Sequence, residues 1–482
     1  MSAPRTAVLQ VINAPDRTGT RFALLALALG GFGLGTTEFA SMGLLPFIAE
    51  DLDASIPSLG HAIALYALGV VVGAPLITSL TARVERKRLL LGLMSAFTVG
   101  NVLSATAPSL EWLYVARFLS GLPHGAYFGV AAVVASSLVP RERRGRAVAR
   151  VALGLTVANI VGVPLAAVLG GTLGWRAGYG LVVAIGLLTV AALALWIPRT
   201  RKGGGVSVAQ EVRALGRPQV ALTLLAGSVG FGGMFAVYTF VSPILTEFSG
   251  LDISAVPWVL ALYGVGMTAG SLLAGPMLDR SIERTALGAG AVSGVALAFF
   301  GLFAHSAVAA VLGVLWIGLM GALFSTALQM RLLREAKDAP SLTAAMNHAA
   351  FNLANAMGAF LGGAVISAGW GYRAPAWVGV GLAVAGLLIL GYAARLHRAG
   401  DAPASSPVRT GPSWASLAVA DLQVLLPEPA HPRPALAGSA RTTSWADLGR
   451  RRGGIPRPGD RSPLSLPPAV GHDGRVRTGG GS

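Results

Sequence analysis

The chain contains twelve apolar segments, each long enough to cross a lipid bilayer as an α-helix. A hydrocarbon core of about 30 Å needs about 20 apolar residues in a helix. Hydrophobic residues make up 54% of the 482 residues and charged residues only 12%, so water could not solvate such a surface. We therefore predict an all-α membrane protein of twelve transmembrane helices. The expected spans are 22–48, 60–82, 88–107, 112–139, 147–171, 177–197, 219–246, 256–278, 286–304, 307–330, 343–368 and 374–394.

The gaps between these segments differ sharply in their basic residues. One alternating set of gaps holds nineteen lysines and arginines, whereas the other set holds only Arg176 and Arg373. Because cations beside a span resist translocation, the basic set should be cytoplasmic. An even number of spans then places both termini in the cytoplasm. Tryptophans near the opposite ends of the spans agree with this orientation, because their rings prefer the membrane interface: Trp112, Trp175, Trp258 and Trp370.

An internal repeat relates residue n to residue n + 197. Pro46, Tyr66 and Arg176 meet Pro243, Tyr263 and Arg373 at this shift, and several glycines match as well. Six spans per repeat give two halves of the same orientation, which can rock about a central site. The expected parts are a cytoplasmic N-terminal segment at 1–21, six-helix bundles at 22–197 and 219–396, a cytoplasmic linker at 198–218, and a disordered basic tail rich in proline and glycine at 397–482.

Two charged residues lie well inside the predicted spans, where a charge costs about 2.5 to 3.5 kcal/mol and needs a reason. They are Glu38 in the first span and Arg117 in the fourth, at compatible depths. An Arg that moves relative to a buried carboxylate would switch it between proton uptake and release. Glu38 and Arg117 are therefore candidates for proton coupling. A permanent ion pair between the two spans, or direct contact with a substrate, would also explain them.

Further polar and aromatic side chains could line a pathway through the bundle. In the fourth span, Arg117, Gly121 and His124 share one helix face, and His348, Asn352 and Asn355 do so in the eleventh. Asparagine and histidine in membrane helices also serve as hydrogen-bonding contacts between helices. Aromatic residues that could contact an amphipathic ligand, or simply pack, are Tyr66, Tyr127, Phe235, Tyr238 and Tyr263.

Several classes of function find no support in the residues. The chain has no cysteine, hence no disulfide framework or zinc-thiolate site, and it lacks the nucleophile or metal cluster of a membrane enzyme. It has no phosphate-binding G-x-x-x-x-G-K-[ST] motif for direct use of ATP. Although the net charge is +16, the basic residues lie between spans rather than on one nucleic-acid-binding face. We expect no enzyme activity, no cofactor and no nucleic-acid partner, and a gradient such as that of protons as the energy source.

Three groups of residues resemble motifs of the major facilitator superfamily, in particular its twelve-span drug:proton antiporters, which include arabinose-efflux-like permeases and chloramphenicol exporters. The first group is Gly35-Thr36-Thr37-Glu38-Phe39 in span 1, together with the segment from Arg117 to Ala126, which is similar to the family's span 4 motif. The resemblance covers about residues 20–396 and implies a role for Arg117 in proton transfer.

The other two groups concern gating and antiport. The segment Gly275-Pro276-Met277-Leu278-Asp279-Arg280 is similar to the family's inner gating motif. Its counterpart after span 2 keeps Arg83, Arg86 and Lys87 but has Thr78 and Ala82 where Gly and Asp are usual. The antiporter motif of span 5 ordinarily has adjacent Gly and Pro, whereas Val163 here separates Gly162 from Pro164.

These features together predict a transporter in the bacterial cytoplasmic membrane that exports a small amphipathic compound in exchange for protons. Export or facilitated passage of a sugar or another polar metabolite is the alternative within transport. A membrane sensor or scaffold that signals through its basic tail is the alternative from another class. The expected partners are a small-molecule substrate, protons and membrane lipid, and the family resemblance implies a monomer.

Overall fold

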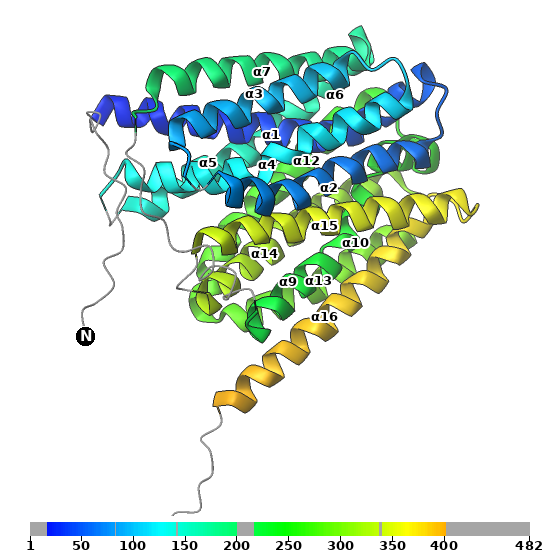
Figure 1. Ribbon diagram of the computed structural model, residues 1–482. Coiled ribbons are helices and arrows are strands. Elements are labelled where there is room, and N and C mark those ends of the chain that lie inside the picture. The colour runs from blue at the N-terminus through cyan, green and yellow to red at the C-terminus, as the bar shows by residue number, and fades with distance from the viewer. Residues whose placement is uncertain (1–16, 82, 141–142, 200–215, 337–339, 402–482) are drawn as a thin grey trace, which may run out of the picture. The chain divides into compact units, whose positions relative to one another are not determined.

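Helices form nearly all of the computed structural model, which describes residues 17–81, 83–140, 143–199, 216–336 and 340–401 (Figure 1). Lipid cannot hydrogen-bond to a peptide group, so a chain this apolar satisfies its backbone within helices. Twelve helices in these ranges are long and apolar enough to cross a membrane, which confirms the predicted number. The predicted tail at 397–482 and linker at 198–218 lie mostly outside the described residues, as does most of the N-terminal segment.

The first six spans comprise eight elements. They are α1 (Arg17–Asp51), α2 (Ile56–Leu80), α3 (Arg86–Ala105), α4 (Leu110–Ser137), α5 (Arg144–Val157), the π-helical turn η2 (Ala158–Gly162), α6 (Val163–Leu173) and α7 (Trp175–Trp196). The fifth span is thus one long helix with a wide turn in its middle. It runs from Arg144 to Leu173, a little longer at both ends than the 147–171 predicted.

The last six spans are less regular. They comprise α9 (Pro218–Gly230), α10 (Gly232–Tyr238), α11 (Val241–Pro243), the π turn η3 (Ile244–Phe248), the 3₁₀ turn η4 (Ile253–Ala255), α12 (Val256–Arg280), α13 (Ile282–Phe303), α14 (Ala307–Glu335), α15 (Pro340–Ser367) and α16 (Ala374–Asp401). The prediction of one continuous helix over 219–246 was wrong, because the seventh span is interrupted at Phe231 and again at Thr239 and Phe240.

The second interruption follows from Pro243. Proline has no N–H to bond the carbonyl four residues earlier, and its ring crowds that carbonyl, here the one of Thr239. Its repeat mate Pro46 lies in α1, which nevertheless continues without a break from Arg17 to Asp51. Equivalent prolines therefore have different outcomes in the two halves, and the packing around each helix decides between them.

Matching glycines let helices approach at equivalent places in the two halves. A Cβ on Gly73 of α2 would lie 2.0 Å from the backbone oxygen of Leu122 in α4. A Cβ on Gly270 of α12 would lie 2.0 Å from that of Leu319 in α14, at the same shift of 197. Small residues at such crossings allow close backbone contact in lipid. The division into two bundles at the predicted residues stays a prediction, and these paired contacts support it.

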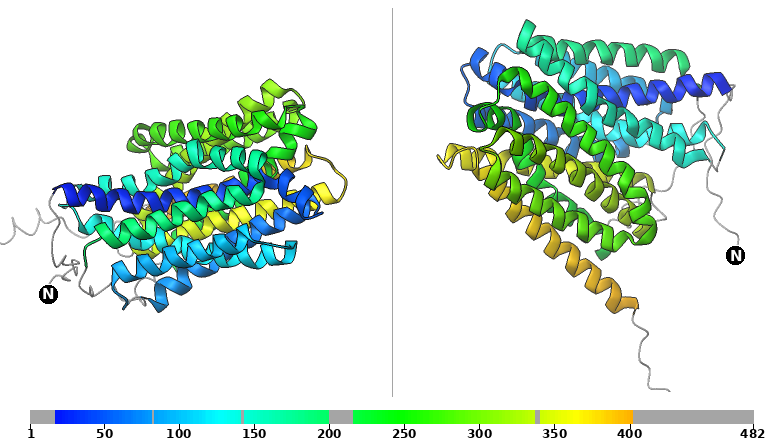
Figure 2. Two further views of the ribbon diagram at one scale, coloured as in Figure 1. Left: turned by 90° about the horizontal axis from the view of Figure 1, so that it is seen from above. Right: turned by 180° about the vertical axis from the view of Figure 1, so that it is seen from behind.

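Helices from the two halves also pack on each other, as α2 and α15 do side by side (Figures 1 and 2). A Cβ on Gly60 of α2 would lie 2.8 Å from the Phe240 ring and 3.4 Å from the backbone oxygen of Ala359. On the other flank, α12 packs against η2 and α6, where a Cβ on Gly264 would lie 2.6 Å from the Asn159 backbone. Glu38 and the polar residues around it lie between these two contacts.

Replacing either matched glycine by alanine should destabilise the protein. Gly→Ala in a helix ordinarily gains about 1 kcal/mol, but Gly73→Ala and Gly270→Ala place a methyl group against backbone that cannot retreat, at a cost of about 1 to 3 kcal/mol. Thermal unfolding of the purified protein in detergent measures the change. The control is Gly92→Ala, because nothing lies within 4 Å of a Cβ there. Equal melting temperatures for all three variants would contradict the close packing.

Candidate functional site

The Glu38 carboxylate lies at the junction of the two halves and is 6% exposed. Its position follows from the glycines beside it in α1. A Cβ on Gly35 would lie 2.9 Å from the Ala158 side chain of η2, so only glycine lets the fifth span pack this close. The groups that interact electrostatically with Glu38 come from four other helices and are Tyr66 of α2, Arg117 and His124 of α4, Tyr263 of α12 and Asn355 of α15.

Arg117 is buried in α4 and is held chiefly by Thr37, the residue before Glu38. Its Nη1 donates to the Thr37 hydroxyl at 3.0 Å and its Nη2 to the Thr37 carbonyl at 3.1 Å. The guanidinium also lies over the Tyr66 ring, 4.2 Å from its centroid, a favourable cation–π contact. No ion pair within 4 Å joins Arg117 to Glu38 among the described residues. The alternative of a permanent ion pair between the two is therefore not realised in this conformation.

The predicted face of α4 packs on Tyr66. Arg117 covers the tyrosine ring, a Cβ on Gly121 would lie 2.1 Å from the Tyr66 backbone oxygen, and His124 Nδ1 lies 2.8 Å from the Tyr66 hydroxyl. His124 Nε2 lies 3.9 Å from Glu38 Oε2, an electrostatic contact beyond hydrogen-bond range. Tyr66 thus connects Arg117 with His124, which spacing along the sequence could not show.

The predicted face of α15 reaches the same place from the other half. The His348 ring stacks on Phe128 of α4 with centroids 4.8 Å apart, and lies 6.3 Å from the His124 ring. The Asn355 amide lies beside the Glu38 carboxylate without a well-formed hydrogen bond to it. Asn352 donates to the His348 carbonyl at 3.1 Å, a contact within its own helix. The structure therefore brings His348 and Asn355 to Glu38 and His124, and gives Asn352 a local bond.

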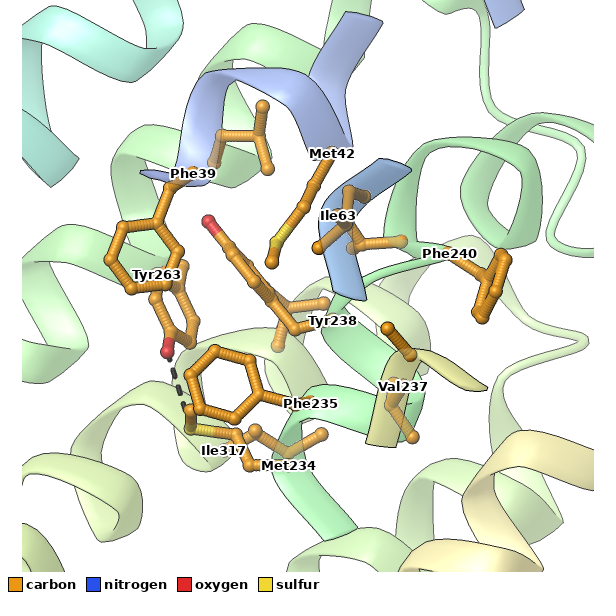
Figure 3. Close-up of a cluster of buried hydrophobic side chains, with 14 of the residues drawn as sticks. Phe39, Met42, Ile63, Met234, Phe235, Val237, Tyr238, Phe240, Tyr263 and Ile317 are labelled. Carbon is orange, nitrogen blue, oxygen red and sulfur yellow. Dashed lines mark hydrogen bonds between the residues drawn. The ribbon is translucent and has the colours of Figure 1, made fainter. Parts of the chain in front are cut away.

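Aromatic rings form a cluster around Phe39, the residue that follows Glu38 (Figure 3). The rings of Tyr238 and Tyr263 stack with centroids 3.9 Å apart, and the Tyr263 hydroxyl contacts Met234 Sδ at 3.2 Å. Phe39 of α1 lies 5.8 Å from the Tyr238 ring and 6.3 Å from the Phe235 ring. Phe39 was missed as a site residue, although it belongs to the Gly35–Phe39 motif and follows Glu38.

Tyr127 lies apart from this cluster. Its hydroxyl donates to the Leu27 carbonyl at 2.9 Å, and its ring occupies the space left by Gly30, where a Cβ would lie 2.0 Å from the hydroxyl oxygen. This tyrosine therefore packs α4 on α1 within the N-terminal half. Among the predicted aromatic residues, Phe235, Tyr238 and Tyr263 lie in the cluster around Phe39, Tyr66 lies with Arg117 and His124, and Tyr127 lies in neither group.

The interrupted seventh span leaves polar atoms without partners next to the aromatic cluster. The hydroxyls of Tyr238, Thr239 and Ser242 are buried and make no hydrogen bond. Each unsatisfied buried group costs about 1 to 3 kcal/mol, so such groups mark places where a ligand or water binds. Discontinuous membrane helices form binding sites in many transporters for the same reason. The signals in the sequence were the cluster of glycines from Gly230 and the proline at 243.

The residues of the predicted antiporter motif form the wide turn of the fifth span. The Val163 N–H bonds the carbonyl of Ala158, five residues earlier, and Pro164 follows without an N–H of its own. A Cβ on Gly162 would lie 2.2 Å from the Thr36 hydroxyl oxygen of α1. Gly162 and Pro164 therefore shape the contact between this turn and the segment that carries Glu38.

Among the described residues, no hydrogen bond or ion pair joins Arg83 or Lys87 to Asp279 or Arg280. Asp279 and Arg280 are exposed at the end of α12, and no hydrogen bond or ion pair of their side chains is found in the part of the chain that the structure describes. Gly275 is exposed, with open space where a Cβ would be. Lys87 donates to the Ala194 carbonyl at 2.7 Å, which joins α3 to α7. Arg83 is exposed. A gating role for these residues and for Arg86 stays a prediction.

A cluster of charged residues at the end of α14 was missed by the sequence analysis. Arg331 was counted as a loop residue after a span ending at 330, but α14 continues to Glu335 and buries Arg331 completely. Its side chain donates to Thr223 at 2.9 Å and Gln219 at 2.7 Å, and it pairs with Glu283, which also pairs with Arg334. Because these partners lie on α9, α13 and α14, only the fold brings them together.

Removing the charge of Glu283 should destabilise the C-terminal half. Glu283→Gln leaves Arg331 buried without its carboxylate, a loss of about 3 kcal/mol for a broken buried pair. Thermal unfolding in detergent measures it. Glu335→Gln serves as the control, because the ion pair that Glu335 makes among the described residues is with Arg334, which is 32% exposed. A decrease no larger for Glu283→Gln than for the control would contradict a structural role for this cluster.

Comparison with known proteins gives concordant results. The family model described as Major Facilitator Superfamily matches residues 27–347. Among relatives, the inner membrane transport protein YdhP of Escherichia coli K12 is 44% identical over 77% of this chain and 94% of its own length. The putative transporter AraJ of the same strain is 35% identical over 73% and 89%. A chloramphenicol resistance protein of Streptomyces lividans is 32% identical over 80% and 98%.

Solved structures show the same fold at low sequence identity. A crystal structure of a mutant of the nucleoside transporter NupG aligns with a TM-score of 0.64 at 12% identity. The alignment covers 78% of this chain and 99% of NupG. It supports the fold alone.

Proposed function

The chain belongs to the Major Facilitator Superfamily, among its drug-efflux-like members, and from this membership we propose that it exports a small amphipathic compound in exchange for protons. It is a multi-pass transporter of the bacterial inner membrane rather than an enzyme. The direction of transport, the coupling to protons and the chemistry of the substrate are the parts that we propose.

The single observation that carries the proposal is the place of Glu38. A carboxylate buried between membrane helices is costly and rarely kept without a function. Here its polar neighbours belong to both halves, because Arg117 and His124 lie on α4 and Asn355 on α15. When the halves rock, Asn355 must move relative to Glu38, whereas Arg117 and His124 lie in the same half as Glu38. A change in surroundings between the two conformations alters the proton affinity of the carboxylate, which is the requirement for coupling.

An amphipathic substrate is supported by the aromatic cluster and by the relatives. Stacked Tyr238 and Tyr263, with Phe39 and Phe235 beside them, present flat apolar surfaces at the junction of the halves. Ligand sites are typically apolar cavities with a few placed polar groups. One relative is a chloramphenicol resistance protein, which supports export as the direction.

A polar metabolite is a second candidate, and the unpaired polar atoms favour it. The hydroxyls of Tyr238, Thr239 and Ser242 and both polar atoms of the Asn355 amide are buried without partners. A sugar or similar compound could satisfy these groups together, whereas a largely apolar drug would leave several unpaired. A screen that includes both classes of compound separates the two candidates.

Replacing Glu38 should abolish proton-driven export. Glu38→Gln keeps the size of the side chain and removes its titration, so an inward pH gradient can no longer drive the substrate out. The measurement is retention of compounds from a mixed panel in an efflux-deficient bacterial host at several external pH values. The control is Glu50→Gln, at an exposed position of the same helix. Export by Glu38→Gln with the pH dependence of the wild type would refute the coupling role.

Reporter fusions should place both termini in the cytoplasm. Fusions at Arg143 and at Lys202 are expected to report the cytoplasmic side, and a fusion at Arg176 the opposite side, because the basic gaps stay inside. Opposite locations for Arg143 and Lys202 would contradict the proposed orientation.

Deleting 401–482 should leave export intact, which would count against a sensor or scaffold that works through its tail.

A further inference from the structure

Two histidines from opposite halves lie side by side, and one of them is next to Glu38. His124 belongs to α4 and His348 to α15, and their ring centroids are 6.3 Å apart at an interplanar angle of 53°. Proton exchange at Glu38 needs a route to water, because the carboxylate is almost fully buried. Imidazole is the side chain best suited to carry protons near neutral pH. The two imidazoles are therefore candidates to carry protons between Glu38 and water.

His124 is placed to exchange a proton with Glu38. Its Nδ1 is bonded to the Tyr66 hydroxyl at 2.8 Å, which fixes the plane of the ring. Its Nε2 is buried, makes no hydrogen bond, and lies 3.9 Å from Glu38 Oε2. A buried nitrogen without a partner is rare in native structures. A small movement of either side chain would bring Nε2 and Oε2 within the range needed for proton transfer.

His348 extends this arrangement toward the cytoplasm. It lies eight residues from Pro340 and nineteen from Ser367, hence nearer the end of α15 that the basic gaps place inside. His124 is completely buried, whereas His348 is partly exposed. Its ring is held flat on Phe128, at an interplanar angle of 10°. One water between the two imidazoles would bridge a separation of this size.

Few other titratable groups face the two histidines. Glu38 of α1, Tyr66 of α2 and His348 of α15 are the titratable groups that face His124. Arg117, on the same helix, is held by Thr37 and by the Tyr66 ring. Among the described residues, His124 is the titratable group that faces His348, and neither ring makes any other ion pair.

We propose that His124 and His348 form a relay that carries protons between Glu38 and the cytoplasm, an inference that rests on the proposed coupling role of Glu38. For uptake, protonated His348 passes a proton through the bridging water to Nε2 of His124 and becomes neutral. Nε2 then passes the proton to Oε2 of Glu38, which leaves His124 neutral and Glu38 as the uncharged acid. Release to the cytoplasm is the reverse, and Nδ1 of His124 stays bonded to Tyr66 throughout.

The relay also depends on conformation. Because the two rings belong to different halves, it is complete only while α4 and α15 are in contact. Separation of the halves on the cytoplasmic side breaks it and admits water directly. His124 and His348 therefore serve proton exchange in the closed arrangement, and the open arrangement does not need them.

The test follows the proton itself and needs no substrate. The purified full chain in lipid nanodiscs is subjected to a pH jump, and infrared absorption follows the protonated carboxyl band of Glu38, identified by its loss in Glu38→Gln. His124→Asn and His348→Asn should each slow the change of this band by at least about tenfold, as expected when a proton-transfer group is removed, and should leave its final amplitude unchanged. His124→Gln provides a second variant at the buried position, and thermal unfolding checks that each variant is folded.

His61→Asn is the matched control. His61 lies on α2, exposed, with its ring beside Tyr114 and Phe360 rather than Glu38, so the rate should stay that of the wild type. Wild-type rates in the folded His124 and His348 variants would overturn the relay and leave the role of Glu38 standing. A changed amplitude at an unchanged rate would also overturn it. Absence of any band that Glu38→Gln removes would overturn the coupling role of Glu38 and the relay with it.

Discussion

Lipid offers no hydrogen bond to a peptide group, and the whole structure follows from this constraint. Each apolar segment must form a helix, and helices in lipid gain little from hiding apolar side chains from one another. Close packing must hold them together instead. This explains why backbones approach at glycines such as Gly73 and Gly270, where a Cβ would lie 2.0 Å from a carbonyl oxygen of the neighbouring helix.

Because lipid cannot bond to free peptide groups, interruptions of regular helical hydrogen bonding are expected only where the protein itself surrounds them. Pro243 interrupts the seventh span, and Pro164 follows the wide turn of the fifth. Both irregular segments face the other half of the molecule, since η2 packs on α12 and α11 packs on α1. Backbone departs from the regular helix where it borders the candidate site. The carboxylate of Glu38 and the rings of Tyr238 and Tyr263 lie beside these segments.

The apolar surroundings also require that each buried charged side chain be stabilised by other groups of the protein. Arg117 is stabilised within its own half by hydrogen bonds to Thr37 and by aromatic rings, and Arg331 is paired with Glu283. Glu38 differs, because its neighbours are divided between the halves and none of them pairs with it closely. A group with neighbours in both halves suits a coupling role, and the histidines on α4 and α15 are divided between the halves in the same way.

The sequence by itself determined the twelve spans and the shift of 197 residues, because bilayer thickness sets helix length and duplication leaves matching residues. It also singled out Glu38, His124 and His348, since polar groups inside apolar segments are conspicuous. Only the tertiary structure decided which of these side chains meet. It placed Tyr127 away from the junction, added Phe39, buried Arg331 and broke the seventh span at Thr239. Contacts between helices depend on how each helix is rotated and tilted against the others, and periodicity within a single segment does not contain that information.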